Sequence, residues 1–277
     1  MLLKAVQPFD FAPALRFIAR FPPTTGEQEV TDSSLVKGFR VAGQDVLARV
    51  SAAPGGLRCE LEGDRLTPEV VAAAADRVRF HLSLDDDLTG FYELADGVFA
   101  DVVEHLRGYH QVKFPSPLEA LVWAILVQRT RSAGAAKAKA AISAHVGNAY
   151  AAFPDLDQLL SLSAGTLAEL VRHSVKGPRL HEVLRAWAEA DESWLREAPY
   201  EEVKRFLLDL PGVGAWSASF ILVRGLGRMD ETPVERQLMA AAERVYGRPF
   251  SERDLRKEAA RYGPWQGYWA HYLRLAE

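Results

Sequence analysis

The sequence contains one cysteine, Cys59, among its 277 residues. No disulfide can form within the chain, and a cysteine-based zinc or iron–sulfur site is excluded. The seven histidines are scattered and do not have the spacing of metal ligands. We therefore expect no cofactor and no catalytic metal, and the single thiol is compatible with a reducing, cytoplasmic compartment.

Long apolar runs are also missing. Nowhere do about 18 apolar residues follow one another, and the N-terminus lacks an apolar core with a small-residue cleavage site. We therefore expect neither a membrane span nor a signal peptide.

Positive charge is in deficit overall, with 33 Lys and Arg against 37 Asp and Glu and a net charge of −4. This balance argues against a general polyanion binder but permits a local basic surface. Such an excess occurs over residues 111–149, where Glu119 is the only acid. The basic side chains there are Lys113, Arg129, Arg131, Lys137, Lys139 and His145.

Strand patterns are confined to the first part of the chain. Apolar and polar residues alternate over residues 34–62, with a turn signal at Pro54-Gly55-Gly56, which indicates an antiparallel hairpin or meander. Helical patterns flank it at residues 10–21 and 67–82, the second with Thr67 as a predicted N-cap. Residues 1–87 are predicted to form a small α+β domain.

Helical spacing dominates the rest of the chain. Short Gly, Pro and Ser connections separate the segments, and Asp155, Ser163 and Ser251 are suitable helix starts. We predict an all-helical domain over residues 88–277 and an α+β fold for the whole chain.

A glycine-rich hairpin, "LPGVG" at residues 210–214, lies between two helical segments. Gly212 and Gly214 permit a tight backbone, and the free amides of the hairpin and of the next helix could hold a phosphate oxygen. The same pattern also fits a plain corner between two helices with a Gly C-cap.

The hairpin and its surroundings resemble a known family. "LPGVGAWSA", followed about 20 residues later by "PVE", resembles the helix–hairpin–helix DNA glycosylases. "PLEALVWAILVQRTRSAGAAKAKAAI" is similar to the helix pair carrying the DNA-wedging loop in the bacterial 3-methyladenine DNA glycosylase II (AlkA) branch, and "RYGPWQGYWAHYLRL" to its C-terminal helix. Residues 1–87 would match the TATA-binding-protein-like domain of that branch, so the resemblance covers nearly the whole chain.

This resemblance implies a monofunctional glycosylase that flips and hydrolytically releases alkylated or otherwise damaged purines from double-stranded DNA. A monomer is expected, cytoplasmic and nucleoid-associated in a bacterium. Lyase-competent relatives carry a nucleophilic lysine two residues after the hairpin, where this chain has Trp216, which cannot form a Schiff base.

Glu235 stands where the family has aspartate. A carboxylate there would stabilise the oxocarbenium-like transition state and orient water. The alternatives are an acid in a first helical turn, which the helix dipole favours, or catalysis by the nearby Asp230.

The resemblance also implies the residues that contact the base and the DNA. A flipped base is held by aromatic stacking; Arg274 stands where the branch has a pocket tryptophan and would repel a cationic base. The alternative for the aromatics near the C-terminus is a core helix, because their spacing is helical. The predicted pocket residues are Trp216, Phe220, Tyr268, Trp269 and Arg274.

The wedge that fills the vacated stack is predicted at Gln128 and Arg129, with a solvated loop as the alternative. Backbone carbonyls of the hairpin could hold a monovalent cation, namely those of Leu208, Leu210 and Val213. The predicted DNA contacts are Gln128, Arg129, Arg131, Leu210, Gly212, Val213 and Gly214.

Two other functions remain open from the sequence. The chain could be a non-catalytic helix–hairpin–helix protein that binds DNA damage. Glu235 in place of the family's aspartate and Arg274 in place of the pocket tryptophan would be compatible with this function. It could also be an unrelated helical protein whose hairpin only packs helices.

Overall fold

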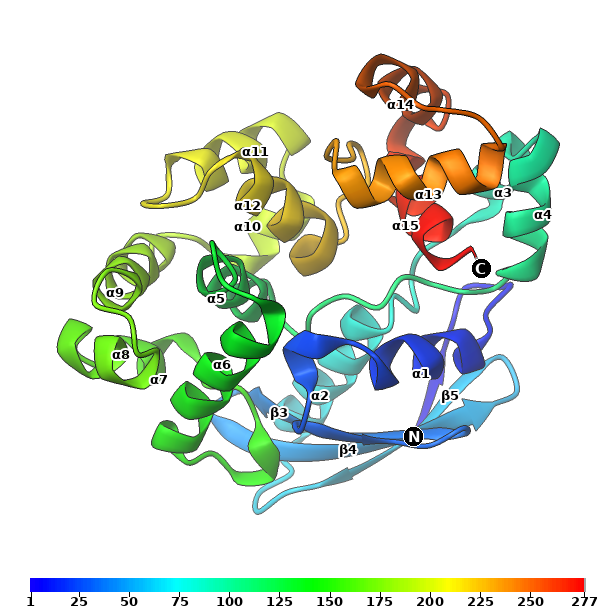
Figure 1. Cartoon of the computed structure of the whole chain (residues 1–277). Helices are drawn as coiled ribbons and strands as arrows, with labels where there is room; N and C mark the ends of the chain where they lie inside the picture. Colours follow the sequence, from blue (N-terminus) through cyan, green and yellow to red (C-terminus); the bar gives the residue numbers. More distant parts are fainter. Residues whose placement is uncertain (277) are drawn as a thin grey trace.

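A computed structural model describes residues 1–276, and it consists of one five-stranded sheet and a large helical region (Figure 1). All neighbouring strands are antiparallel, in the order β1-β5-β4-β3-β2. The strands are β1 (Leu2–Lys4), β2 (Gln28–Val30), β3 (Ser34–Val41), β4 (Gln44–Ala53) and β5 (Gly56–Glu62).

The predicted meander is confirmed as β3, β4 and β5, which are joined by two-residue turns. Both turns carry a glycine with positive φ, Gly43 at 69° and Gly55 at 74°, as tight hairpins require. On β4 the alternate residues Val46, Ala48 and Val50 are buried, so one face of the sheet lies against the core. Helix α2 packs on that face.

One helix precedes the long strands, and the other helices occupy most of the chain after residue 66. They are α1 (Phe11–Ala19), α2 (Pro68–His81), α3 (Thr89–Leu94), α4 (Gly97–His105), α5 (Pro117–Leu126), α6 (Ser132–Val146), α7 (Leu156–Leu160), α8 (Ala164–Leu170), α9 (Lys176–Trp187), α10 (Glu192–Glu197), α11 (Tyr200–Asp209), α12 (Ala215–Phe220), α13 (Arg236–Tyr246), α14 (Glu252–Ala260) and α15 (Gln266–Leu275). Short 3-10 turns occur at Pro22–Thr24, Ala149–Ala151 and Gly263–Trp265, and α12 continues as a π-helix, Ile221–Leu226.

The predicted helix starts are confirmed. The side chains of Thr67, Asp155, Ser163 and Ser251 each accept a hydrogen bond from a backbone N–H in the first turn of the following helix. Such caps satisfy donors that the helix itself leaves free.

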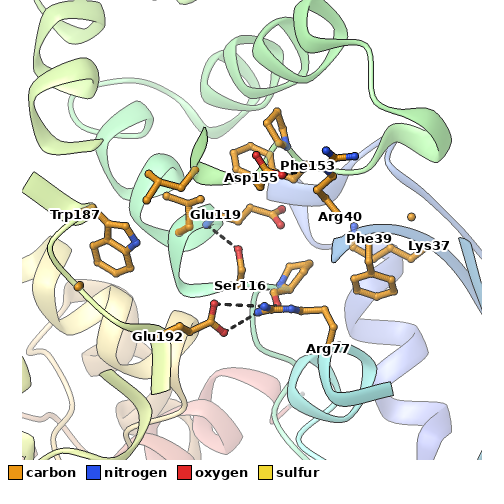
Figure 2. Close-up of a pocket in the computed structure, with 16 residues that line it drawn as sticks. Lys37, Phe39, Arg40, Arg77, Ser116, Glu119, Phe153, Asp155, Trp187 and Glu192 are labelled. Carbon is orange, nitrogen blue, oxygen red and sulfur yellow. Dashed lines mark hydrogen bonds and ion pairs between the residues drawn. The ribbon is translucent and has the colours of Figure 1, made fainter. Parts of the chain in front are cut away.

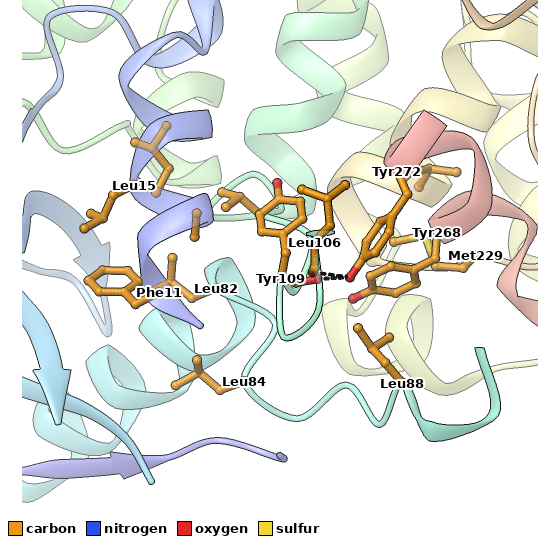
Figure 3. Packing of buried hydrophobic residues seen from close by; sticks show 14 of the residues in the cluster. Phe11, Leu15, Leu82, Leu84, Leu88, Leu106, Tyr109, Met229, Tyr268 and Tyr272 are labelled. Carbon is orange, nitrogen blue, oxygen red and sulfur yellow. Dashed lines mark hydrogen bonds between the residues drawn. The ribbon is translucent and has the colours of Figure 1, made fainter. Parts of the chain in front are cut away.

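Two hydrophobic cores organise the chain, and they do not follow its linear order. One contains the sheet, helices α1 to α4 and helices α13 to α15; Figure 3 shows Phe11, Leu82, Tyr109 and Tyr268 within it. The other lies within residues 114–226 and joins α5 to α12. The boundary between residues 87 and 88 stays a prediction, and the first core extends on both sides of it.

A buried charge cluster of two lysines and two glutamates ties the sheet region to the helices. The Nζ atom of Lys139 on α6 lies 2.5 and 2.6 Å from the two carboxylate oxygens of Glu27, and 2.7 Å from Glu119 on α5. Lys37 on β3 lies 3.8 Å from Glu27. All four side chains are at least 90% buried.

This cluster corrects the basic excess inferred from the sequence. Lys139 is neutralised in the interior, and Lys113 is also buried and lies 3.5 Å from Asp86. On residues 111–149 the exposed arginine and lysine side chains are therefore those of Arg129, Arg131 and Lys137.

Within residues 1–276, no helix is both long and apolar enough to span a bilayer.

Candidate active site

The hairpin of residues 210–214 joins α11 to α12, as predicted. Gly212 has a φ of 77°, and a Cβ atom there would lie 2.4 Å from Cδ of Arg179, so only glycine fits. Gly214 is the N-cap of α12 and offers no capping side chain. The first N–H groups of α12 are therefore free of a side-chain cap, which is an arrangement that suits an anion.

The wedge loop, residues 127–131, connects α5 to α6 and contacts the hairpin directly. The side-chain amide of Gln128 donates to the carbonyl oxygen of Gly212 at 2.9 Å and to Oγ of Ser217 at 3.3 Å. Arg129, at the tip, is exposed and has a φ of 51°. A non-glycine residue held in the left-handed region is strained, and such strain is often kept for function.

A cavity of about 400 Å³ lies beside the hairpin. Its lining comes from the end of α1, the start of the wedge loop, α12, the coil before α13, and α15. In Figure 1 these elements surround the centre of the molecule. This volume falls within the range of ligand pockets, about 300–1,000 Å³. Four of the predicted site residues line it: Trp216, Phe220, Glu235 and Arg274.

Glu235 is held from two sides in this cavity. Its Oε1 atom accepts a hydrogen bond from Nε1 of Trp216 at 2.8 Å, and its Oε2 atom accepts one from Arg274 at 3.0 Å. Its side chain is 26% exposed, so a ligand can reach it, and the two hydrogen bonds fix its orientation. Glu235 is the N-cap of α13 and not a first-turn residue, and its side chain makes no capping bond. The carboxylate is thus turned into the cavity, away from the helix end.

Trp216 and Phe220 form the aromatic wall. Their rings are stacked, with centroids 5.2 Å apart and an interplanar angle of 21°, as residues one helical turn apart allow. Trp216 remains 42% exposed, which is unusual for a large aromatic side chain. An exposed stacked indole can accept a planar ring on its free face.

Two predicted pocket residues are elsewhere. Tyr268 and Trp269 are fully buried and do not line the cavity. The Tyr268 hydroxyl donates to Asp86, and Nε1 of Trp269 donates to the Tyr246 hydroxyl at 3.1 Å. Both residues belong to the core of the sheet, as the core-helix alternative expects, and Figure 3 shows Tyr268 there.

Several lining residues were missed by the sequence analysis. Phe17 and Phe21 come from the N-terminal region, and Arg224 comes from the π-helical extension of α12. The Arg224 guanidinium lies 4.8 and 4.9 Å from the centroids of these two rings. Gln111, with its amide oxygen turned toward Arg224, accepts a hydrogen bond from Nη1 at 3.0 Å.

The charge of the cavity follows from these groups. Burial lowers the pKa of Arg224 to about 10, so it remains a cation at neutral pH. Burial also lowers the pKa of His271, another lining residue, well below its usual value, so its ring is neutral. The lining therefore carries the guanidinium groups of Arg20, Arg224 and Arg274 against the carboxylate of Glu235.

A second cavity, of about 240 Å³, lies where the sheet region meets the helices (Figure 2). Its charged side chains already have partners. Arg77 donates to Glu192 at 2.8 Å, and Arg40 donates to Asp155 at 2.9 Å. Because the members of each pair satisfy each other, we interpret this cavity as part of the interface between the two cores.

No cluster of His, Cys, Asp or Glu within residues 1–276 could hold a metal ion. The carbonyl oxygens of Leu210 and Val213 belong to the hairpin and that of Leu208 to the last turn of α11; the Leu210 oxygen accepts from the Val213 N–H at 3.1 Å. Backbone carbonyls are suitable ligands for hard cations, and the monovalent cation stays a prediction.

Comparison with known proteins identifies relatives. No protein-family model matches the chain. A Mycobacterium tuberculosis protein named probable bifunctional transcriptional activator/DNA repair enzyme AlkA is 30% identical over 261 residues, which cover 90% of this chain and 51% of that protein. A Bacillus subtilis DNA-3-methyladenine glycosylase is 24% identical, over 69% of this chain and 67% of its own length. The chain thus spans about half the length of its Mycobacterium tuberculosis relative.

Solved structures share the fold. The 3-methyladenine DNA glycosylase from Archaeoglobus fulgidus superposes with a TM-score of 0.80 at 20% identity, covering 99% of this chain and 96% of that one. The resemblance read from the sequence is thus confirmed: the chain is similar in sequence to proteins named AlkA and DNA-3-methyladenine glycosylase, and it shares the fold of a 3-methyladenine DNA glycosylase.

Proposed function

We propose that the protein is a monofunctional DNA glycosylase that hydrolytically releases alkylated or otherwise damaged purines from duplex DNA. The observation that carries this proposal is Glu235, whose carboxylate faces an aromatic cavity beside the hairpin and is oriented by Trp216 and Arg274. The names of the relatives support it, since they include DNA-3-methyladenine glycosylase.

The mechanism needs one carboxylate. As the bond between C1′ and the base nitrogen breaks, its electron pair leaves with the base and positive charge develops on the sugar. The Glu235 carboxylate stabilises that charge, and each of its oxygens keeps a lone pair beyond the bond it already accepts. A water molecule then bonds to C1′ through its oxygen and gives up one proton to Glu235 or to solvent, and an uncharged purine takes up one proton from solvent as it leaves.

The same residues argue against a lyase. Trp216 occupies the position of the nucleophilic lysine in lyase-competent relatives, and its indole N–H is engaged with Glu235. The free face of Trp216 and the ring of Phe220 would hold the flipped base by stacking.

The charge of the cavity bears on the substrate. Three guanidinium groups against one carboxylate oppose a cationic base, although Arg274 is partly neutralised by its contact with Glu235. We therefore expect uncharged damaged purines, whose carbonyl or ring-nitrogen acceptors suit these donors, among the substrates.

A glycosylase assay tests the function. Duplexes carrying a methylated purine, hypoxanthine, uracil or ethenoadenine are incubated with the protein, and abasic sites are then cleaved with alkali. We expect strand breaks at one or more damaged purines, and none without alkali because there is no lyase step. Tight binding to these duplexes without any base release would instead identify a non-catalytic damage binder.

Arg129 is expected to fill the space of the flipped base. Arg129→Ala should weaken binding to a duplex with an abasic analogue by about 5- to 150-fold, from a stacking energy of about 1–3 kcal/mol, and should weaken binding to undamaged duplex much less. Fluorescence anisotropy with both duplexes measures the difference. Arg131→Ala, which removes a neighbouring exposed charge, is the matched control and should reduce both affinities equally. If Arg129→Ala also weakened binding to both duplexes equally, Arg129 would be only a phosphate contact.

A further inference from the structure

A groove of about 580 Å³ lies between α6 and the loop that joins α8 to α9, next to the wedge loop. Its polar lining consists of Thr130, Lys137, Arg172, His173 and Lys176, and the remaining lining residues are small or aliphatic. No carboxylate lines it. The proposed function does not use this groove.

The chain segments that form the groove are free of acids. Neither residues 120–154 nor residues 170–181 contain an aspartate or a glutamate, although the whole protein has a net charge of −4. The exposed cations of the two segments, Arg129, Arg131, Lys137, Arg172 and Arg179, lie on or near the wedge loop and the hairpin. A cationic surface on an acidic protein concentrates anions locally.

Lys176 lines the groove and is 8% exposed. Its Nζ atom donates to the carbonyl oxygen of Leu126 at 2.6 Å and to the hydroxyl of Thr130. Within residues 1–276 it makes no ion pair, and the ammonium group has three N–H donors. A buried cation with a remaining donor and no counter-charge is suited to an anionic ligand.

Lys176 also fixes the wedge loop. Leu126 is the last residue of α5, and its carbonyl has no helical partner because the N–H of Thr130 bonds to Val127 instead. A cation at a helix C-terminus is favourable. The wedge loop is thus tied to the hairpin through Gln128 and to the groove through Thr130, with Arg129 between them.

His173 and Arg172 point to the same chemistry. Nδ1 of His173 accepts hydrogen bonds from the N–H groups of Val175 and Lys176, at 3.2 and 3.3 Å. Because Nδ1 accepts these bonds, the ring carries a proton on Nε2, which makes the exposed side chain a donor. Arg172 is exposed and has a φ of 51°, the same value as Arg129 in the wedge loop.

We propose that this groove binds a backbone phosphate of duplex DNA, so that the wedge at Arg129 is flanked by phosphate contacts from the hairpin and from the groove. Lys137, Arg172, His173 and Lys176 supply the donors. The inference rests on the proposed function, because it requires duplex DNA as the ligand.

Salt dependence of binding tests the groove. The affinity for a duplex with an abasic analogue and for an undamaged duplex is measured across a series of potassium chloride concentrations, for the wild type, Arg172→Ala and Lys137→Ala. Each lost phosphate contact should reduce the slope of log K against log salt by about one. It should also weaken binding to both duplexes equally. Arg58→Ala, which removes an exposed arginine on β5 of the sheet, is the control and should leave the slope unchanged.

The outcomes separate the two proposals. If both groove variants keep the wild-type slope, the groove is not a phosphate site, whether or not the protein releases bases. Reduced slopes together with no base release by the wild type support the groove and overturn the glycosylase. A wild-type protein that does not bind duplex DNA overturns both.

Discussion

Replacing Glu235 with glutamine should lower the rate of base release by about 100- to 1,000-fold, which is the usual cost of removing one group that stabilises transition-state charge. The amide keeps the shape of the carboxylate but carries no negative charge to oppose the developing positive charge on the sugar. Binding should survive, because Glu235 contacts Trp216 and Arg274 and is separate from the hairpin and the wedge loop. Single-turnover assays measure release, and anisotropy with an abasic-analogue duplex measures binding.

Two further variants make this result specific. Glu197→Gln changes an exposed glutamate outside the cavity in the same way and should release bases at the wild-type rate. Glu235→Asp restores the acid of the family but withdraws it from Trp216 and Arg274, and misplacement by about 1 Å can cost roughly 100-fold in rate. Wild-type release by Glu235→Gln would remove Glu235 from the mechanism and direct attention to Asp230.

Replacing Lys139 with methionine should lower the free energy of unfolding by about 3–5 kcal/mol, the usual cost of breaking a buried ion pair by removing one partner. Burial alone would lower the pKa of Lys139, but Glu119 and Glu27 outweigh it, so the net direction is upward and the cation is held firmly. Without that cation, Glu27 and Glu119 face the interior with only Lys37 nearby. Urea unfolding followed by circular dichroism gives the difference.

The matched control lies on the same helix. Lys137→Met makes the same chemical change at an exposed position of α6 and should stay within about 0.5 kcal/mol of the wild type, as surface substitutions usually do. A Lys139→Met protein as stable as Lys137→Met would show that the cluster contributes nothing net. Joint replacement of all four charged residues by apolar ones should cost less than the single change, because no buried charge is then left unpaired.

Local signals in the sequence predicted much of the fold. The sheet follows from alternation and turn glycines, and four helix starts follow from capping side chains at Thr67, Asp155, Ser163 and Ser251. These signals act over a few residues, so they can be read without the tertiary structure. The union of the sheet with α13 to α15 in one core is a long-range arrangement, and no local pattern indicates it.

The candidate site was predictable where it depends on one segment. Trp216, Phe220 and Glu235 were named from the hairpin and the residues after it, and the structure brings them together. Tyr268 and Trp269 were assigned to the pocket from the resemblance, and the alternative that their helical spacing offered, a core helix, agrees with their complete burial. Phe17 and Phe21 could not be found, since they are about 200 residues from Trp216 in the sequence. Arg224 lies in an apolar run, and only its buried position above two phenylalanine rings gives it significance.

The division of the two cores has a consequence for synthesis. The core within residues 114–226 is continuous in sequence, whereas the core of the sheet needs residues from both ends of the chain. On a ribosome, the N-terminal strands emerge long before α13 to α15, which complete their core. We expect the middle of the chain to mature before its beginning, with protease resistance arising first in residues 114–226 of nascent chains. The core of the sheet is then expected to stay incomplete until α13 to α15 have emerged.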